Sequence, residues 1–337
     1  MLLLVRILNA IHHIIVFLAV FVSIAGCQSQ HHEQEQALSS SSLPISYYYW
    51  KTNIDIPADW IQEYAPQKMY VKALDIAYRN KVELVVSNLK HLDSVSFVPV
   101  VFIEYKLFSH KTAEQVSDLI MRQLPPEKYP AIQMDCDWTL QSKESYFQFL
   151  SILKQNYQDL SVTIRLHQVK YFQKTGVPPA HRGVLMYYNM SDVRDPSTEN
   201  YILDLDIAKK YHYNFDSYPL QLDLALPIYK HGRVFRRDKL AMLLNVNRLN
   251  TDSLAAIGDG NNRVFKVLKG HYSGGKYLYQ DDIIKIDEVS FAQLSLAVEG
   301  LQDIMNPKEI IFYEQAYAKD FGAEKLSILA KGWENTE

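Results

Sequence analysis

The chain has 337 residues, of which 48% are hydrophobic, 22% charged and 12% aromatic, a composition typical of a globular protein. A formal net charge of −3 argues against a nucleic-acid partner, because such proteins usually carry a basic surface. Two cysteines are too few for a disulfide framework or for a cysteine-based zinc site.

Residues 1–26 have the pattern of a lipoprotein signal peptide. Arg6 supplies a positive charge, and an apolar run over 14–26 is shorter than the about twenty residues that span a bilayer. The run ends in Ile24-Ala25-Gly26-Cys27, which resembles the lipobox of bacterial lipoproteins. This resemblance implies cleavage before Cys27 and lipidation of its thiol. An uncleaved N-terminal anchor helix is the alternative.

Residues 27–42 are predicted to be the lipidated cysteine and a flexible tether, because they are rich in Gln and Ser and have no apolar period. Gln28 follows the cysteine, whereas an Asp at this place retains some lipoproteins at the inner membrane. We therefore expect a membrane-anchored protein of the bacterial cell envelope, with the outer membrane favoured. Residues 43–337 are expected to form a single domain.

From residue 43 onward, strand-like segments alternate with amphipathic helices. Capping patterns predict helices that begin near Thr112, Ser142 and Ser290, and a last helix is predicted over 323–331. Eight strands are predicted, at 45–50, 68–76, 96–105, 131–137, 160–167, 183–188, 221–227 and 309–313.

This alternation predicts a parallel sheet, and eight strands in one domain favour a (β/α)8 TIM barrel. An open doubly wound sheet is less favoured, because no glycine-rich phosphate turn follows the first strand. Residues 233–288 interrupt the pattern with Gly-rich turns and short strand-like pieces. We interpret this segment as an elaborated connection between strands seven and eight.

Active sites of such barrels lie at the carboxyl ends of the strands. The fourth strand carries Asp135 and Asp137, which period-two alternation places on the same side. Two close carboxylates repel each other, so one of them can hold a proton near neutral pH, as a general acid requires. A helix cap or an ion pair with Arg165 is the alternative interpretation.

Other strand ends supply further candidates. Glu104 and Glu314 are candidates for a second catalytic carboxylate, and Asp75 ends the second strand. The candidate substrate-binding residues are polar or aromatic groups at the strand ends: Trp50, Trp138, Arg165, His167, Tyr187, Tyr188, Asn189 and Tyr229. No HExxH helix or EF-hand loop is present, so we expect no metal and no other cofactor.

The runs IQMDCDWT, RGVLMYYNM and PLQLDLALPIY resemble an uncharacterised family of glycosidase-like TIM-barrel proteins, over residues 45–332. More distantly, the fourth strand resembles that of chitinase-like glycosidases, which read Asp-x-Asp-x-Glu with the Glu as acid. Asp135 and Asp137 match the two aspartates, whereas Thr139 occupies the position of the Glu. The resemblance implies a glycan substrate and leaves the proton donor to another residue.

The leading hypothesis is a lipoprotein that hydrolyses or modifies a glycan. In it, Asp137 is the acid, Asp135 is its tuning partner, and Glu104 or Glu314 is the second carboxylate. A non-catalytic glycan-binding or assembly protein on the same barrel is the alternative, since the missing Glu is what a retired enzyme would show. A metal-dependent hydrolase that uses His167 is a third possibility. We expect a monomer.

Overall fold

The computed structural model describes residues 42–89, 95–257 and 263–333. The predicted signal peptide, Cys27 and nearly all of the predicted tether lie outside these residues. Within them, no helix combines the length and the apolar character that crossing a membrane requires.

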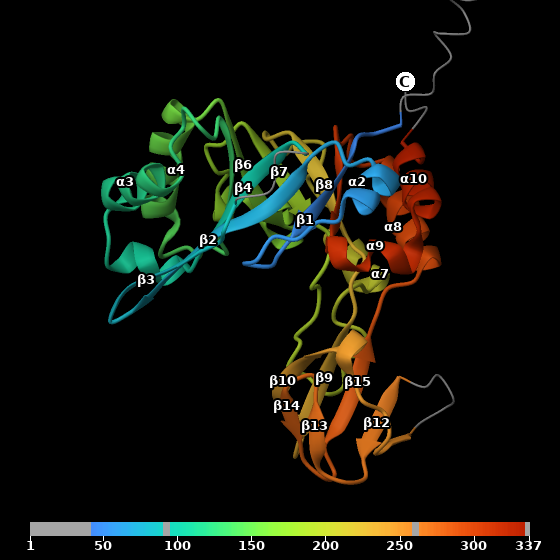
Figure 1. Cartoon of the computed structure of the whole chain (residues 1–337). Coiled ribbons are helices and arrows are strands. Elements are labelled where there is room, and N and C mark those ends of the chain that lie inside the picture. Colours follow the sequence, from blue (N-terminus) through green and yellow to red (C-terminus); the bar gives the residue numbers. More distant parts are fainter. Residues whose placement is uncertain (1–41, 90–94, 258–262, 334–337) are drawn as a thin grey trace, which may run out of the picture. The chain divides into compact units, whose positions relative to one another are not determined.

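Eight parallel strands close into a barrel, which confirms the predicted (β/α)8 fold (Figure 1). Their order around the barrel is β1-β16-β8-β7-β6-β5-β4-β2, and pairing of β1 with β2 closes the ring. The barrel strands are β1 (Ile45–Tyr49), β2 (Met69–Arg79), β4 (Phe97–Ile103), β5 (Ala131–Asp135), β6 (Asp159–Arg165), β7 (Arg182–Met186), β8 (Leu222–Pro227) and β16 (Ile310–Tyr313).

Helices connect most of the barrel strands. The capping boxes at Thr112 and Ser290 form as predicted, and the last helix covers the predicted residues. The helices are α2 (Ala58–Tyr64), α3 (Ala113–Gln123), α4 (Lys143–Asn156), α5 (Leu166–Lys170), α6 (Phe172–Thr175), α7 (Leu205–Lys209), α8 (Phe291–Gln302), α9 (Ala318–Phe321) and α10 (Ala323–Lys331). Short 3-10 turns lie at Tyr105–Ser109, Val246–Arg248 and Gln315–Tyr317.

A hairpin on the second barrel strand was not predicted. The strand β2 continues to Arg79, turns at Asn80 with a φ of 63°, and returns as β3 (Lys81–Val86). Residues 69–71 of β2 pair with β1, whereas residues 74–79 pair with β3 and extend beyond the part that pairs with β1. The hairpin therefore adds a wall at the carboxyl end of the barrel.

The elaborated connection between β8 and β16 forms a small antiparallel sheet. Its strand order is β10-β9-β15-β12-β11, and a separate hairpin pairs β13 with β14. The sheet has an apolar cluster of its own, made of Val234, Leu244, Val267, Leu278 and Ile284. The strands are β9 (His231–Arg236), β10 (Lys239–Asn245), β11 (Leu254–Ala256), β12 (Val264–Val267), β13 (His271–Ser273), β14 (Lys276–Leu278) and β15 (Ile283–Asp287).

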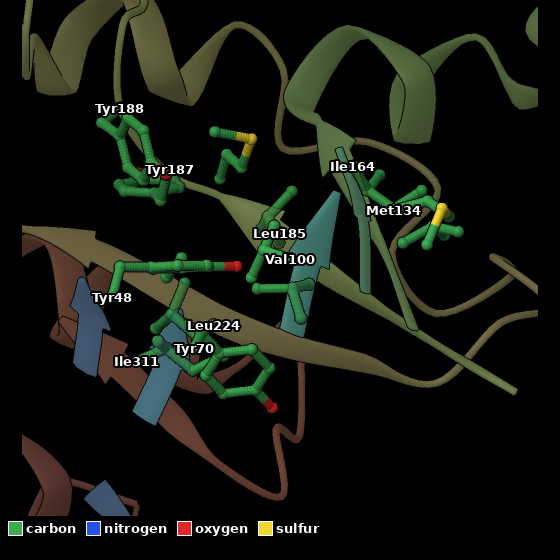
Figure 2. Packing of buried hydrophobic residues seen from close by; sticks show 14 of the residues in the cluster. Tyr48, Tyr70, Val100, Met134, Ile164, Leu185, Tyr187, Tyr188, Leu224 and Ile311 are labelled. Carbon is green, nitrogen blue, oxygen red and sulfur yellow. The ribbon is translucent and has the colours of Figure 1, made fainter. Parts of the chain in front are cut away.

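The main core combines aliphatic side chains with a large number of tyrosines. Figure 2 shows Tyr48 from β1 and Tyr70 from β2 within this core, and their ring centroids lie 5.3 Å apart. The hydroxyl of Tyr48 donates to Gln133 Oε1 over 2.6 Å, and Gln133 Nε2 donates to Ser161 Oγ over 3.2 Å. These three buried polar side chains therefore satisfy one another, which removes most of the penalty for burying them.

Candidate active site

A cavity of about 500 Å³ opens at the carboxyl ends of the barrel strands, where such folds hold their active sites. Its walls come from β1, β2, β4, β5, β6, β7 and β16 and from the β2–β3 hairpin. The lining residues are Tyr48, Trp50, Lys72, Asp75, Ala77, Arg79, Glu83, Val85, Phe102, Asp135, Thr163, Arg165, Met186, Tyr188, Asn189 and Tyr313.

Asp135 is the buried carboxyl of this cavity. It is the last residue of β5, and only 8% of its surface is exposed. Burial raises the pKa of Asp135 to about 6, although the Thr163 hydroxyl and the charge of Arg165 lower it. Thr163 Oγ1 donates to Asp135 Oδ1 over 2.8 Å. A carboxyl in this state can deliver a proton near neutral pH.

Asp75 is a second carboxyl of the cavity, and Glu83 on the β2–β3 hairpin is a third. The strand register pairs Asp75 with Phe102 on β4, and Phe102 with Asp135 on β5, so the three side chains point to the same face of the sheet. Two inter-strand steps of about 4.8 Å place the two aspartate Cα atoms about 10 Å apart. Asp75 also forms an ion pair with Lys72, with 2.9 Å between Nζ and Oδ2. From the sequence, Asp75 had no role beyond ending a strand, because only the register shows that it lies on the same face of the sheet as Asp135.

Asp137 lies outside the lining of the cavity. The strand β5 ends at Asp135, and the Asp137 side chain is 59% exposed. Both of its oxygens accept hydrogen bonds from Arg165, over 2.8 Å from Nε and 3.1 Å from Nη2. This ion pair is the alternative that the sequence left open for Asp137. Because Arg165 itself lines the cavity, Asp137 acts on the site by orienting that guanidinium.

Glu104 and Glu314 also lie outside the lining residues. Glu104 precedes the 3-10 turn at Tyr105–Ser109, and its nearest cation is Lys106 at 3.8 Å. Glu314 follows β16, where burial raises its pKa and the charges of Lys51 and Lys72 lower it. Neither carboxyl shares the cavity with Asp135. Of the two other carboxyls in the lining, Glu83 lies on the β2–β3 hairpin with its side chain 47% exposed, whereas Asp75 lies on a barrel strand two positions from β5.

The candidate aromatic residues divide between the cavity and the core. Trp50 and Tyr188 line the cavity, and Tyr188 stacks on Tyr313 with centroids 5.3 Å apart. The indole of Trp138 stacks on a core tyrosine and donates to the Thr175 carbonyl over 3.2 Å. Trp138 is not among the lining residues and is 6% exposed, so it packs in the core.

Three further aromatic or polar candidates lie around the end of β7. The Tyr187 hydroxyl lies 2.9 Å from His212 Nε2, away from the cavity lining. Asn189 lines the cavity with a φ of 56° and accepts a hydrogen bond from the Tyr229 hydroxyl over 2.5 Å. Tyr229 therefore supports a lining residue from behind.

His167 differs from its predicted setting. The chain leaves β6 after Arg165 and begins α5 at Leu166, so His167 is helical and does not continue the strand face of Arg165. It lines a smaller cavity of about 150 Å³ beside the main one. Burial and the charge of Arg165 lower the pKa of His167, which favours the neutral ring.

Metal ligands do not gather in the part of the chain that the structure describes: no group of three or more His, Cys, Asp or Glu side chains there is placed to hold a metal ion. In particular, His167 and Asp135 line different cavities.

No family model matches the sequence, and no curated protein matches it. Solved structures do match. The spore cortex-lytic enzyme SleL of Bacillus cereus has a TM-score of 0.55 at 12% identity, over 88% of this chain and 75% of that chain. The chain shares the fold of this enzyme, a (β/α)8 barrel.

Two further solved structures match this chain over their whole length. The class V chitinase of Nicotiana tobaccum has a TM-score of 0.54 at 11% identity, over 88% of this chain and 100% of that chain. The glycoside hydrolase family 18 N-acetylglucosaminidase of Paenibacillus barengoltzii has a TM-score of 0.51 at 9% identity, over 86% of this chain and 100% of that chain. A mutant of the tobacco enzyme has also been solved in complex with NAG4.

Proposed function

We propose that the protein hydrolyses glycosidic bonds in an N-acetylhexosamine-containing glycan. The observation that carries this proposal is that Asp135 and Asp75 line the same cavity at the barrel mouth. Asp135 has a pKa raised to about 6 by burial, and Asp75 is ion-paired with Lys72. One carboxyl that holds a proton and one that carries a charge are the two groups that glycoside hydrolysis requires.

Each carboxyl has a distinct role in this proposal. Asp135 gives its proton to the glycosidic oxygen as the bond from that oxygen to the anomeric carbon breaks. Asp75 acts at the anomeric carbon, either on an attacking water or as the nucleophile. The two Cα atoms are about 10 Å apart, and inward-pointing side chains shorten that span toward the about 5–9.5 Å between carboxyls in glycoside hydrolases.

The cavity also offers the contacts that a sugar needs. Trp50 and Tyr188 present aromatic surface, while Arg165 and Asn189 present polar groups. Sugars combine apolar C–H faces with hydroxyl groups, and sites of this mixed kind bind such ligands. Enzymes with the same fold are chitinases and an N-acetylglucosaminidase, which favours an N-acetylhexosamine over other sugars.

A glycan-binding protein without catalytic activity is the second candidate. Thr139 stands where the chitinase-like pattern has its acid, and its backbone N–H donates to Ser142 Oγ over 3.0 Å. Thr139 lies in the turn before α4 and contributes no acid to the cavity. This observation favours a barrel that has kept its binding surface and lost its original proton donor.

The first test is reducing-end release from chitin, peptidoglycan, α-glucans and β-glucans by the purified protein. We expect new reducing ends from chitin or peptidoglycan, because both contain N-acetylhexosamine. Release from the α-glucan alone would contradict the proposed substrate class. Binding to chitin or peptidoglycan without any release would support the second candidate, the binding protein.

We also propose that lipid on Cys27 anchors the protein in a bacterial envelope. Support comes from the lipobox-like Ile24-Ala25-Gly26-Cys27 and the apolar run before it. Two or three acyl chains hold a protein stably at a membrane, whereas one chain binds only marginally.

Radiolabelled palmitate should enter the wild-type protein and be absent from Cys27→Ala, which should also keep the mass of the precursor. Cys136→Ala is the matched control and should label like the wild type, because Cys136 is buried in the barrel domain. A wild-type protein of precursor mass without label would indicate the alternative, an uncleaved anchor helix.

A further inference from the structure

The smaller cavity lies beside the main one at the ends of β6 and β7. Its volume is about 150 Å³, and beyond the shared wall it reaches His167 and Tyr211. The residues that line both cavities are Arg165, Met186, Tyr188 and Asn189. A ligand seated beside Asp135 can therefore extend along this wall toward Tyr211.

Tyr211 belongs to a cluster of three tyrosines around one ammonium group. The Nζ atom of Lys170 lies 5.3 Å from the ring centroid of Tyr171, 5.2 Å from that of Tyr211 and 4.8 Å from that of Tyr213. Tyr171 is 49% exposed and Tyr213 is 59% exposed, so both rings present surface to solvent. The attraction of the cation for the ring faces holds the three rings together.

Hydrogen bonds fix this cluster to the barrel. Lys170 Nζ donates to the Lys210 carbonyl, and Asn214 Nδ2 donates to the Lys170 carbonyl over 2.8 Å. Both bonds connect α5 to the loop that follows α7. A ligand that contacts rings already held in place loses less of its binding free energy to ordering the protein.

We propose that Tyr171, Tyr211 and Tyr213 form an outer sugar subsite, the tyrosine subsite, which binds a further sugar of the glycan chain held in the main cavity. The inference rests on the proposed function. The wall that the two cavities share favours the same glycan chain as the occupant. Tyrosine suits this occupant, because its ring packs against the C–H face of a sugar and its hydroxyl bonds to the sugar hydroxyls. The protein therefore prefers long oligosaccharides to short ones.

The experiment measures the affinity of the full-length protein, in mild detergent, for N-acetylglucosamine oligomers of two to six units by isothermal titration calorimetry. Affinity should rise with length in the wild type. Tyr213→Ala and Tyr171→Ala should weaken binding of the hexamer about fivefold to tenfold, and binding of the dimer less than twofold. Lys170→Met should likewise weaken binding of the hexamer more than binding of the dimer. Lys170→Arg keeps the positive charge and should bind the hexamer about as tightly as the wild type.

Tyr272→Ala is the matched control, because this tyrosine is 73% exposed on the β13–β14 hairpin and has no part in the subsite. It should bind every oligomer like the wild type. Equal loss for dimer and hexamer, or no loss for the hexamer, overturns the tyrosine subsite and leaves the proposed function standing. Failure of the wild type to bind any oligomer overturns the proposed substrate class together with the subsite.

Discussion

Asp135→Asn is expected to lower kcat/KM on the glycan that the wild type cleaves by about 10²–10⁴-fold, the usual contribution of a general acid. The amide keeps the size of the side chain and can still accept from Thr163 Oγ1, so the cavity keeps its shape. What it loses is the proton that the leaving oxygen needs. Kinetics of reducing-end release by the two proteins measure the effect.

The dependence of the wild-type kcat/KM on pH should reflect the ionisation of Asp135. Burial raises the pKa of Asp135 to about 6, so its acid form predominates below that pH and falls tenfold with each further unit above it. We therefore expect kcat/KM to decline on the alkaline side with an apparent pKa near 6. The residual activity of Asp135→Asn should lack this decline.

Measuring the stability of Asp135→Asn shows whether its loss of activity is due to unfolding. The folded-state pKa of Asp135 lies above its ordinary value of 3.8, so ionisation is easier in the unfolded chain and the stability cost grows as pH rises from about 4 to 6. At pH 8 the shift corresponds to about 3 kcal/mol, which the amide does not incur. Asp135→Asn should therefore be at least as stable as the wild type at pH 8.

Asp118→Asn on α3 is the matched control, because this aspartate is exposed and does not line the cavity. It should change neither activity nor its pH dependence. Wild-type activity in Asp135→Asn would assign the proton to another group, and an equal loss in both variants would point to a general effect of lowering charge.

The barrel could be predicted from sequence because its signals are local. Each barrel strand is a short apolar run, and helices begin at caps such as Thr112 and Ser290. The strand β3 was not predicted. Its residues, Lys81–Val86, are largely exposed and present no buried face. Its position depends on hydrogen bonds to β2, which no local pattern reports.

The sequence predicted that the site lies at the strand ends, but not which carboxyls line it. The sequence placed Asp135 and Asp137 together at a strand end, and period-two alternation then favoured both as inward-facing. The strand β5 ends at Asp135, so alternation no longer governs Asp137, and its side chain turns to Arg165 instead. Asp75 needed information of another kind, since its place opposite Asp135 follows from the register of three strands.

The same limit explains Trp138. An aromatic ring after a strand end has similar sequence signals whether it lines a mouth or packs under a helix. Here the indole packs against Tyr146 of α4, and its N–H reaches the Thr175 carbonyl. Only the path of the chain after β5 decides between these two outcomes, and that path is set by tertiary packing.

Arg233→Met is expected to lower the free energy of unfolding by about 3–5 kcal/mol, the usual effect of removing one partner of a buried ion pair. Arg233 on β9 and Asp287 on β15 both have fully buried side chains, with 2.6 Å between Nε and Oδ2. The guanidinium also donates to the carbonyls of Asp195 and Thr198, in the segment that follows β7. The arginine thus links the inserted sheet to the barrel domain.

The loss should depend on pH in a defined direction. Burial raises the pKa of Asp287, and its hydrogen bonds with Arg233 lower it. Without the arginine the folded-state pKa rises further, so the variant regains stability as falling pH protonates Asp287. Urea unfolding of both proteins at pH 5 and pH 8 should therefore show a smaller difference at pH 5.

Two variants separate the charge from the packing. Arg194→Met removes an exposed ion pair with Asp192 and should leave the free energy of unfolding nearly unchanged. The double variant Arg233→Met with Asp287→Leu removes both buried charges and should recover most of the loss, because no carboxylate is then left unpaired. If the double variant were as unstable as Arg233→Met, the bonds to Asp195 and Thr198 would be the larger contribution. The arginine would then act chiefly by holding the segment after β7 against the inserted sheet.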